Sequence, residues 1–184
     1  CGECGGDGSS CNEELSHFTN LPDETGVSSL VIIQNAMDLD PGDEIGLFDA
    51  NGIVDSEGNT GELLVGAGIW TGDGQIEVVG IESVDLSDFG GPILPGYVLG
   101  NEIIYRVWKA TDDAEYDAEV EYSAGDGSWG SVLTVVSLLE PIFSIIQDIT
   151  LNPFTFNIAS FNVAPEDASV ESVFGSLDLL LVKN

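Results

Sequence analysis

The residues best suited to chemistry are acidic and lie close together in the first third of the chain. Four carboxylates stand within seven residues and a fifth follows: Asp38, Asp40, Asp43, Glu44 and Asp49. Oxygen ligands of this kind surround hard cations, so calcium is the expected cofactor of this turn. The spacing does not match an EF-hand loop, and Pro41 interrupts it. The alternative is a solvated turn whose Asp side chains accept backbone hydrogen bonds.

A second acidic stretch is also a candidate for calcium, and it consists of Asp112, Asp113, Glu115 and Asp117. Paired carboxylates also serve as the acid and base of glycosidases, where they face each other across a substrate cleft. No group of sugar-stacking aromatic residues stands beside any acidic pair in this sequence. We therefore do not expect a glycosidase.

Other catalytic patterns are not found in the sequence. His17 is the single histidine, and there is neither a Gly-x-Ser-x-Gly elbow nor a Gly-rich phosphate loop with a lysine. We expect that the chain is not an enzyme. Lys109 among many acids leaves one covalent alternative, an isopeptide bond to an Asp or Asn side chain.

The aromatic residues offer a possible ligand platform. Trp70 and Trp108 end apolar alternations that point inward, which is typical of core residues. Trp129 lies between Gly127-Ser128 and Gly130, and we expect it to be exposed and to be the residue that would stack on a sugar.

The cysteines are confined to one end of the chain. Cys1, Cys4 and Cys11 lie in CGECGGDGSSC, a Gly-, Ser- and acid-rich stretch that predicts a linker over residues 1–16. We expect disulfides in an oxidising compartment, with at least one partner outside this stretch. The alternative is zinc, with His17 as a fourth ligand.

The charge is the most unusual feature of the composition. The 184 residues include 33 acidic and 3 basic ones, and the formal net charge is -30 at pH 7. Such a chain excludes nucleic acid as a partner and disfavours anionic membranes. No run of 18 or more apolar residues predicts a membrane-spanning helix. An acidic surface adapted to a salty medium is the alternative to dedicated calcium sites.

Short apolar runs separated by turn residues fill the middle of the chain. They predict seven strands: 29–37, 44–48, 62–70, 75–84, 102–110, 116–122 and 131–139. We therefore expect an all-β fold, an Ig-like antiparallel β-sandwich over residues 17–140. Residues 141–184 would add C-terminal strands, either as the start of a second module or as a donor strand.

Several motifs resemble a secreted β-sandwich module of large extracellular proteins of Bacteroidota and related marine bacteria. They are GDEIGLFD at 42–49, VGAGIW at 65–70, PGY at 95–97 and IYRVWKA at 104–110. The N-terminal stretch resembles a Cys-Gly-Asp-rich repeat (CGxCGGDGSSC) that precedes such modules. The resemblance implies export, by the type IX route, structural cysteines, and a role at the cell surface or in a matrix. Since the chain begins at Cys1 without a leader, we expect a mature or internal segment.

The C-terminal segment is apolar enough to pair with another chain. Strands left at an edge invite strand addition, and a head-to-tail contact of that kind builds a filament. The residues expected in the contact are Phe154, Phe156, Phe161, Leu179 and Leu181. We expect a non-enzymatic, extracellular structural or adhesive module that assembles with itself. The alternative is a calcium-dependent carbohydrate-binding module of a secreted hydrolase, with a surface polysaccharide as its partner.

Overall fold

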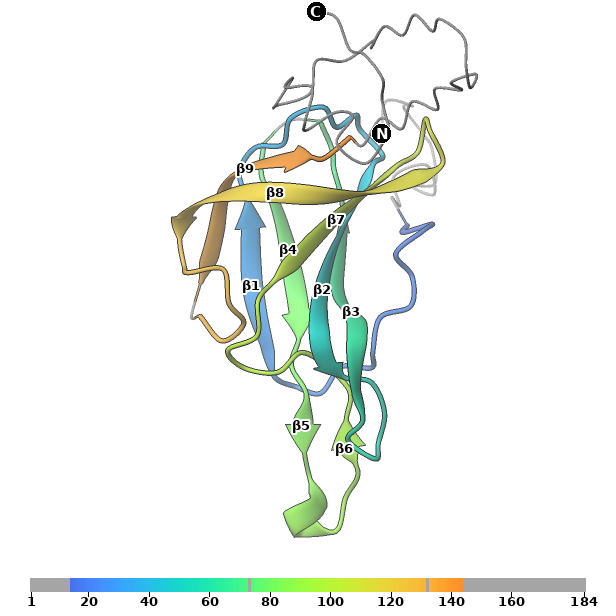
Figure 1. The fold of residues 1–184 in the computed structure, drawn as a ribbon, viewed down its shortest axis with the longest axis vertical. Coiled ribbons are helices and arrows are strands. Elements are labelled where there is room, and N and C mark those ends of the chain that lie inside the picture. The colour runs from blue at the N-terminus through green and yellow to red at the C-terminus, as the bar shows by residue number, and fades with distance from the viewer. Residues whose placement is uncertain (1–13, 73, 132, 144–184) are drawn as a thin grey trace, which may run out of the picture. The chain divides into compact units, whose positions relative to one another are not determined.

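A computed structural model describes residues 14–72, 74–131 and 133–143, which all belong to one compact unit ending at Phe143. Within these ranges the chain forms strands and one 3-10 turn, without an α-helix (Figure 1). The elements are β1 (Ser28–Ile33), β2 (Glu44–Ile53), β3 (Thr60–Ile69), β4 (Ile76–Ile81), β5 (Val84–Asp85), η2 (Ser87–Phe89), β6 (Ile93–Leu94), β7 (Ile104–Lys109), β8 (Ala114–Ala124) and β9 (Thr134–Pro141). The expected all-β fold is confirmed.

The seven strands expected from the sequence are all present, with ends that differ by a few residues. Alternation explains why they are recognisable. Along β7, buried and half-buried residues alternate from Ile104 to Lys109, and along β8 half-buried and exposed residues alternate over most of its length. Each strand therefore has one face toward the core and one away from it.

Seven strands form one sheet in the order β3-β2-β7-β8-β9-β1-β4. Its neighbouring strands are antiparallel except β1 and β9, which run parallel where Val31–Ile33 meets Thr134–Val136. The expectation of a purely antiparallel sandwich is wrong at this pair. Alternation specifies which face of a strand is buried, but it does not specify the direction of the neighbouring strand.

The sheet folds over on itself, so that its two edge strands meet. A Cβ atom on Gly66 of β3 would lie only 2.6 Å from the carbonyl oxygen of Val79 on β4. The glycine therefore allows the two edges to approach closely. The result is a sandwich-like fold around one main core, formed by Val31, Ile33, Ile45, Leu47, Val65, Trp70, Ile76, Val78, Tyr97, Ile103, Tyr105, Val107, Trp129, Val136 and Leu139.

A smaller apolar cluster covers the other face of β2. Phe18, from the segment before β1, packs with Phe48 and Leu64 there. Residues on both faces of β2 are thus buried from Glu44 to Asp49. This double burial depends on the N-terminal segment staying in place.

A narrow arm projects from the end of the sandwich where β4 ends (Figure 1). It consists of β5, η2 and β6, and β5 and β6 pair only with each other. Its tip is closed by main-chain bonds from Gly90 to Ser87 and from Gly91 to Leu86, both 2.9 Å long. The arm was not expected from the sequence, because its strands have two residues each and lie among turn-forming residues.

Two sets of sequence-based expectations fall outside the described residues. These are the disulfides of Cys1, Cys4 and Cys11, and the assembly contacts of Phe154, Phe156, Phe161, Leu179 and Leu181. Residues 144–184, in which the second of these sets lies, are all outside the described ranges. Across residues 14–143, apart from 73 and 132, the structure has no helix long and apolar enough to span a membrane.

Candidate functional site

Asp43, the third of the five expected calcium ligands, is buried in an ion pair with Lys109. Lys109 Nζ lies 3.1 Å from Asp43 Oδ2, and the backbone N–H of Ala110 donates to Asp43 Oδ1 at 2.9 Å. The same ammonium donates to the carbonyl oxygen of Asp38 at 2.5 Å. These contacts join the start of β2 to the end of β7.

Lys109 stays charged in this position. Burial lowers the pKa of its ammonium, but the hydrogen bond and charge of Asp43, with the charges of Asp40 and Asp112, outweigh that effect and raise the pKa above its ordinary value. A protonated amine has no free electron pair to attack a carboxyl carbon. The contact is therefore an ion pair, and its chemistry does not favour an isopeptide bond.

Glu44, the next residue, faces the opposite way and holds the N-terminal segment. Its Oε1 accepts the Ser16 hydroxyl at 2.7 Å, and its Oε2 accepts the backbone N–H groups of His17 and Phe18 at 3.1 and 2.8 Å. The His17 ring stacks on Trp108 with a centroid distance of 5.3 Å and an interplanar angle of 4°. We call Glu44 and residues 16–18 the N-terminal clasp.

The clasp is expected to open in acid. Burial raises the pKa of Glu44, but the hydrogen bonds from Phe18, Ser16 and His17 together outweigh burial and lower it below the ordinary value of 4.5. A carboxyl whose folded pKa is lowered contributes stability above its unfolded pKa and loses it as the pH falls through the folded value. We expect protease cleavage within residues 14–24 to accelerate below about pH 4.5.

Glu44→Gln should produce this opening at neutral pH. The neutral amide loses the charge-assisted bonds, which are worth about 2 kcal/mol together, so cleavage should accelerate roughly tenfold or more. Limited proteolysis followed by mass spectrometry measures the rate. Glu119→Gln, on the exposed side of β8, is the matched control and should cleave like the wild type. Equal cleavage of all three proteins at pH 7 would contradict a clasp held by Glu44.

Asp49 is fully buried and connects β2 to the loop after β6. Its carboxylate accepts the backbone N–H groups of Asn51 and Val98, each at 2.8 Å, and the side-chain amide of Asn101 at 2.8 and 3.0 Å. The hydrogen-bonding capacity of this buried carboxylate is thus satisfied by donors of the fold itself. Asp49 thus stabilises a loop junction.

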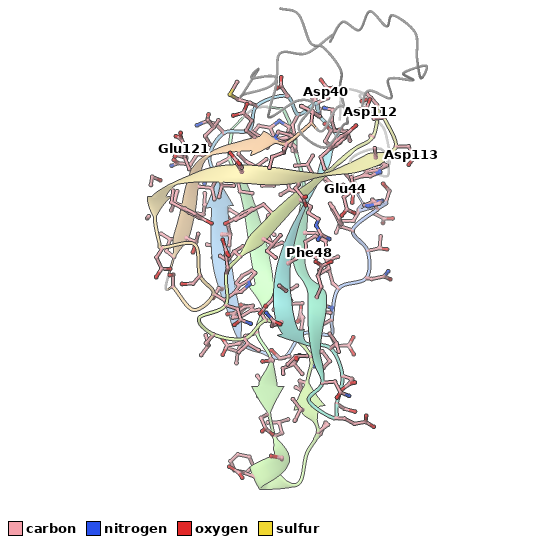
Figure 2. The ribbon with its side chains drawn as sticks, viewed as in Figure 1. Asp40, Glu44, Phe48, Asp112, Asp113 and Glu121 are labelled. Atoms are coloured by element: carbon pink, nitrogen blue, oxygen red, sulfur yellow. The ribbon has the colours of Figure 1, made fainter. Side chains whose placement is uncertain are left out.

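The five expected calcium ligands do not form one group. Asp43, Glu44 and Asp49 each face a different set of donors, while Asp38 and Asp40 lie at the surface. In Figure 2, Asp40, Asp112 and Asp113 lie toward one end of the sandwich. No cluster of three or more His, Cys, Asp or Glu side chains suited to a metal ion occurs among residues 14–72, 74–131 and 133–143.

The second acidic stretch continues along β8 as an exposed stripe: Glu115, Asp117, Glu119 and Glu121. Arg106 lies 3.4 Å from Glu115 and 3.3 Å from Asp117, and it also binds Glu62 at 2.7 Å. Beyond its reach, Glu119 stands directly opposite Glu140 of β9. Like charges at opposing positions destabilise a sheet unless salt screens them. An acidic surface adapted to a salty medium, the alternative to dedicated calcium sites, stays a prediction.

The expectation that Trp129 is an exposed platform for a sugar is wrong. Trp129 is only 2% exposed and therefore cannot stack on a ligand at the surface. Its ring stacks on Tyr97 with centroids 4.3 Å apart, and it covers the backbone of Gly80. The glycines beside it were interpreted as a sign of exposure. Instead, the turn that they form folds the ring back into the core.

Both ends of the described chain meet at one end of the sandwich. His17 contacts Trp108 and Glu115, and nearby Phe143 packs edge-on against Tyr116 with ring centroids 4.9 Å apart. The arm projects from the opposite end (Figure 1). The sandwich therefore separates the points where the chain enters and leaves from the arm.

Phe89 stands at the tip of the arm and is 89% exposed, more than any other large apolar side chain in the described ranges. At the base of the arm lies a groove of about 340 Å³, whose walls include Leu21, Val54, Leu63 and Leu94. Neither the exposure of Phe89 nor the groove was expected from the sequence. The only sequence signal was Asp88-Phe89-Gly90-Gly91, an aromatic residue inside a turn.

A second cavity, of about 420 Å³, lies where the pairing of β7 with β8 ends at Tyr105 and Ala118. Tyr105 and Tyr122 line it together with the acids Glu102, Asp117 and Glu119. Burial raises the pKa of Tyr105, so its hydroxyl stays neutral. Tyrosine and carboxylate groups together provide hydrogen-bond partners for a polar ligand.

Comparison with known proteins adds no relative. No protein-family model matches the chain, and neither the curated proteins nor the solved structures give a match. The function must therefore be argued from the geometry.

Proposed function

We propose that this chain is a non-enzymatic extracellular structural module with an adhesive role, tethered at one end of its sandwich and making contact through the arm at the other. One observation carries the proposal: Phe89 is 89% exposed at the tip of an arm that points away from the points of chain entry and exit. An aromatic side chain is the kind of residue that dominates binding energy when a partner buries it.

The buried ionisable groups support a structural role. Asp43, Glu44 and Asp49 are occupied by donors of the fold itself, and Lys109 is paired. A catalytic acid or base needs a free position within reach of a substrate. The acidic surface supports the extracellular part of the proposal, because a salty medium screens its self-repulsion. Head-to-tail assembly through the C-terminal strands stays a prediction.

The second candidate function is that of a carbohydrate-binding module, in which Trp129 is no longer a sugar-binding residue. The cavity beside β7 and β8 favours it, because Tyr105, Tyr122 and three carboxylates line the space. Sugar hydroxyls accept and donate hydrogen bonds to such groups. Calcium dependence stays part of this candidate.

The two candidates are separated by a retention experiment. Beads carry the protein through its N-terminal cysteines and pass under flow over an alkyl film, a neutral polysaccharide film and a basic protein film. Wild-type beads should be retained on at least one film, and Phe89→Ser should weaken retention about 30-fold or more, the effect of losing an aromatic worth 2 kcal/mol. Val79→Ser removes another exposed apolar side chain, on β4, and should change nothing.

The outcomes differ for the two candidates. Equal retention of wild type and Phe89→Ser on every film, or retention on none, would reject the adhesive arm. The carbohydrate-binding module would be favoured if the beads were retained on the polysaccharide film only, and if this retention required calcium and were unchanged in Phe89→Ser.

A further inference from the structure

We propose that the arm end binds a basic polypeptide segment that carries apolar side chains. The inference rests on the proposed adhesive function and names the chemistry of its partner.

The groove is of a size to take one apolar side chain. Its volume is about 340 Å³, and Leu21, Leu63, Leu94 and Pro95 contribute to its walls. A cavity of about 150 Å³ already holds benzene. A leucine or phenylalanine side chain therefore fits into the groove with room for the start of its backbone.

The acidic side chains around the groove and on the arm favour a positively charged partner. Asp23 and Glu24 line the groove, and Asp85 and Asp88 lie on the arm. Arg106 is engaged with three carboxylates on β3 and β8, and Lys109 is buried at the opposite end of the sandwich. Lysine or arginine residues beside the apolar anchor would pair with the four acids.

The same charges disfavour other partners. A second copy of the chain would bring a net charge of -30 against an identical acidic surface. Nucleic acids and anionic lipids would meet the same repulsion. A basic polypeptide is the partner whose charge complements the arm end.

One extended segment can reach both anchors. Leu94, at the groove, and Phe89, at the tip, are five residues apart along the arm. Five fully extended residues cover roughly 16 Å, at about 3.3 Å per residue, and because a turn at Gly90 shortens this stretch, the backbones of the two anchors lie no farther apart than that. A peptide of about seven residues thus contacts Phe89 with one apolar side chain and fills the groove with another.

The test uses three labelled heptapeptides: KLKGKFK, the control KSKGKSK, which keeps the charges but lacks the apolar anchors, and the acidic control ELEGEFE. Fluorescence anisotropy measures the dissociation constants at about 0.15 M salt, where the Debye length is about 8 Å. We expect KLKGKFK to bind at least tenfold more tightly than KSKGKSK, and ELEGEFE not to bind. Phe89→Ser should weaken the binding of KLKGKFK at least tenfold.

A matched pair of double variants separates a site from general attraction. D85N/D88N removes two charges from the arm, and E119Q/E121Q removes two from the stripe on β8. Only the first should weaken binding. Equal weakening by both, or equal binding of KLKGKFK and KSKGKSK, would overturn the proposal in favour of unspecific attraction.

Two further results would also overturn it. Dimerisation that depends on Phe89, seen by sedimentation at the same salt concentration, would assign the arm end to a second copy. Retention of beads that depends on Phe89, without any binding of KLKGKFK, would leave the adhesive function standing and reject a basic polypeptide as the partner.

Discussion

Lys109→Met is expected to lower the free energy of unfolding by about 3–5 kcal/mol, because it leaves the buried Asp43 carboxylate without its counter-charge. Asp43 is 1% exposed, and Lys109 Nζ lies 3.1 Å from its Oδ2. Two backbone donors remain, the N–H groups of Ala110 at 2.9 Å and of Asp40 at 2.8 Å, and neither carries a charge that balances the carboxylate. Urea unfolding at pH 7, followed by tryptophan fluorescence, measures the loss.

Two controls test the cause. Asp43→Asn combined with Lys109→Met removes both charges and should recover much of the loss, since replacing a whole buried pair costs far less than breaking it. Arg106→Met, on the same strand, removes a more exposed cation and should cost about 1 kcal/mol or less. A loss equal to that of Arg106→Met would show that Asp43 is hydrated and that the pair adds little.

The pair should also be lost at high pH. The pKa of Lys109 is raised above its ordinary value of 10.5. A lysine with a raised folded pKa contributes its full stability below the unfolded value and loses it as the pH rises through the folded one. The stability of the wild type should therefore fall above about pH 10.5, and that of the double variant should not fall for this reason.

The strands could be predicted from the sequence because their pattern is local. Alternation in Tyr105 and Val107, and in Ala118, Val120 and Tyr122, places one set of side chains in the core. The parallel contact between β1 and β9 could not be predicted, because it joins residues about 100 positions apart. Tertiary packing decides such contacts, and alternation is compatible with either direction.

The acidic turn shows what can and what cannot be predicted from residues that are neighbours in the sequence. The sequence predicted five calcium ligands in this region, of which Asp43, Glu44 and Asp49 are buried and Asp38 and Asp40 are exposed. Their roles depend on distant donors: Phe18 lies 26 positions from Glu44, and Asn101 lies 52 from Asp49. Successive residues of a strand point to opposite faces, which is why Asp43 and Glu44 bind different partners instead of one cation.

The burial of Trp129 and the exposure of Phe89 could not be predicted from the sequence, for one physical reason. Glycines mark a turn, but they do not say whether the turn carries its side chain inward or outward. At Trp129 the turn directs the ring onto Tyr97, whereas at Gly90 it leaves Phe89 in solvent. Only the packing around each turn distinguishes the two cases.

Gly80→Ala should be the most damaging single-methyl change near Trp129. A Cβ atom at position 80 would lie 2.4 and 2.6 Å from two carbons of the Trp129 ring. The ring cannot move away freely, because Tyr97 stacks on it at 4.3 Å and the backbone N–H of Trp129 is bonded to Asn101 at 2.8 Å. Overpacking a rigid core costs about 1–3 kcal/mol, and we expect the upper part of that range.

Gly61→Ala is the matched control for this prediction. Its Cβ would come no closer than 3.3 Å to a side-chain carbon of Val54, so the same change on β3 should cost little. Urea unfolding gives the two free energies, and near-ultraviolet circular dichroism reports the stacking of Trp129 on Tyr97. If Gly80→Ala unfolded like Gly61→Ala and its aromatic signal were lost, the Trp129 ring would have left Tyr97 at little cost and would have to be mobile. A mobile ring at this position would mean that the loop carrying it can open, and Trp129 would regain the surface role that its burial now excludes.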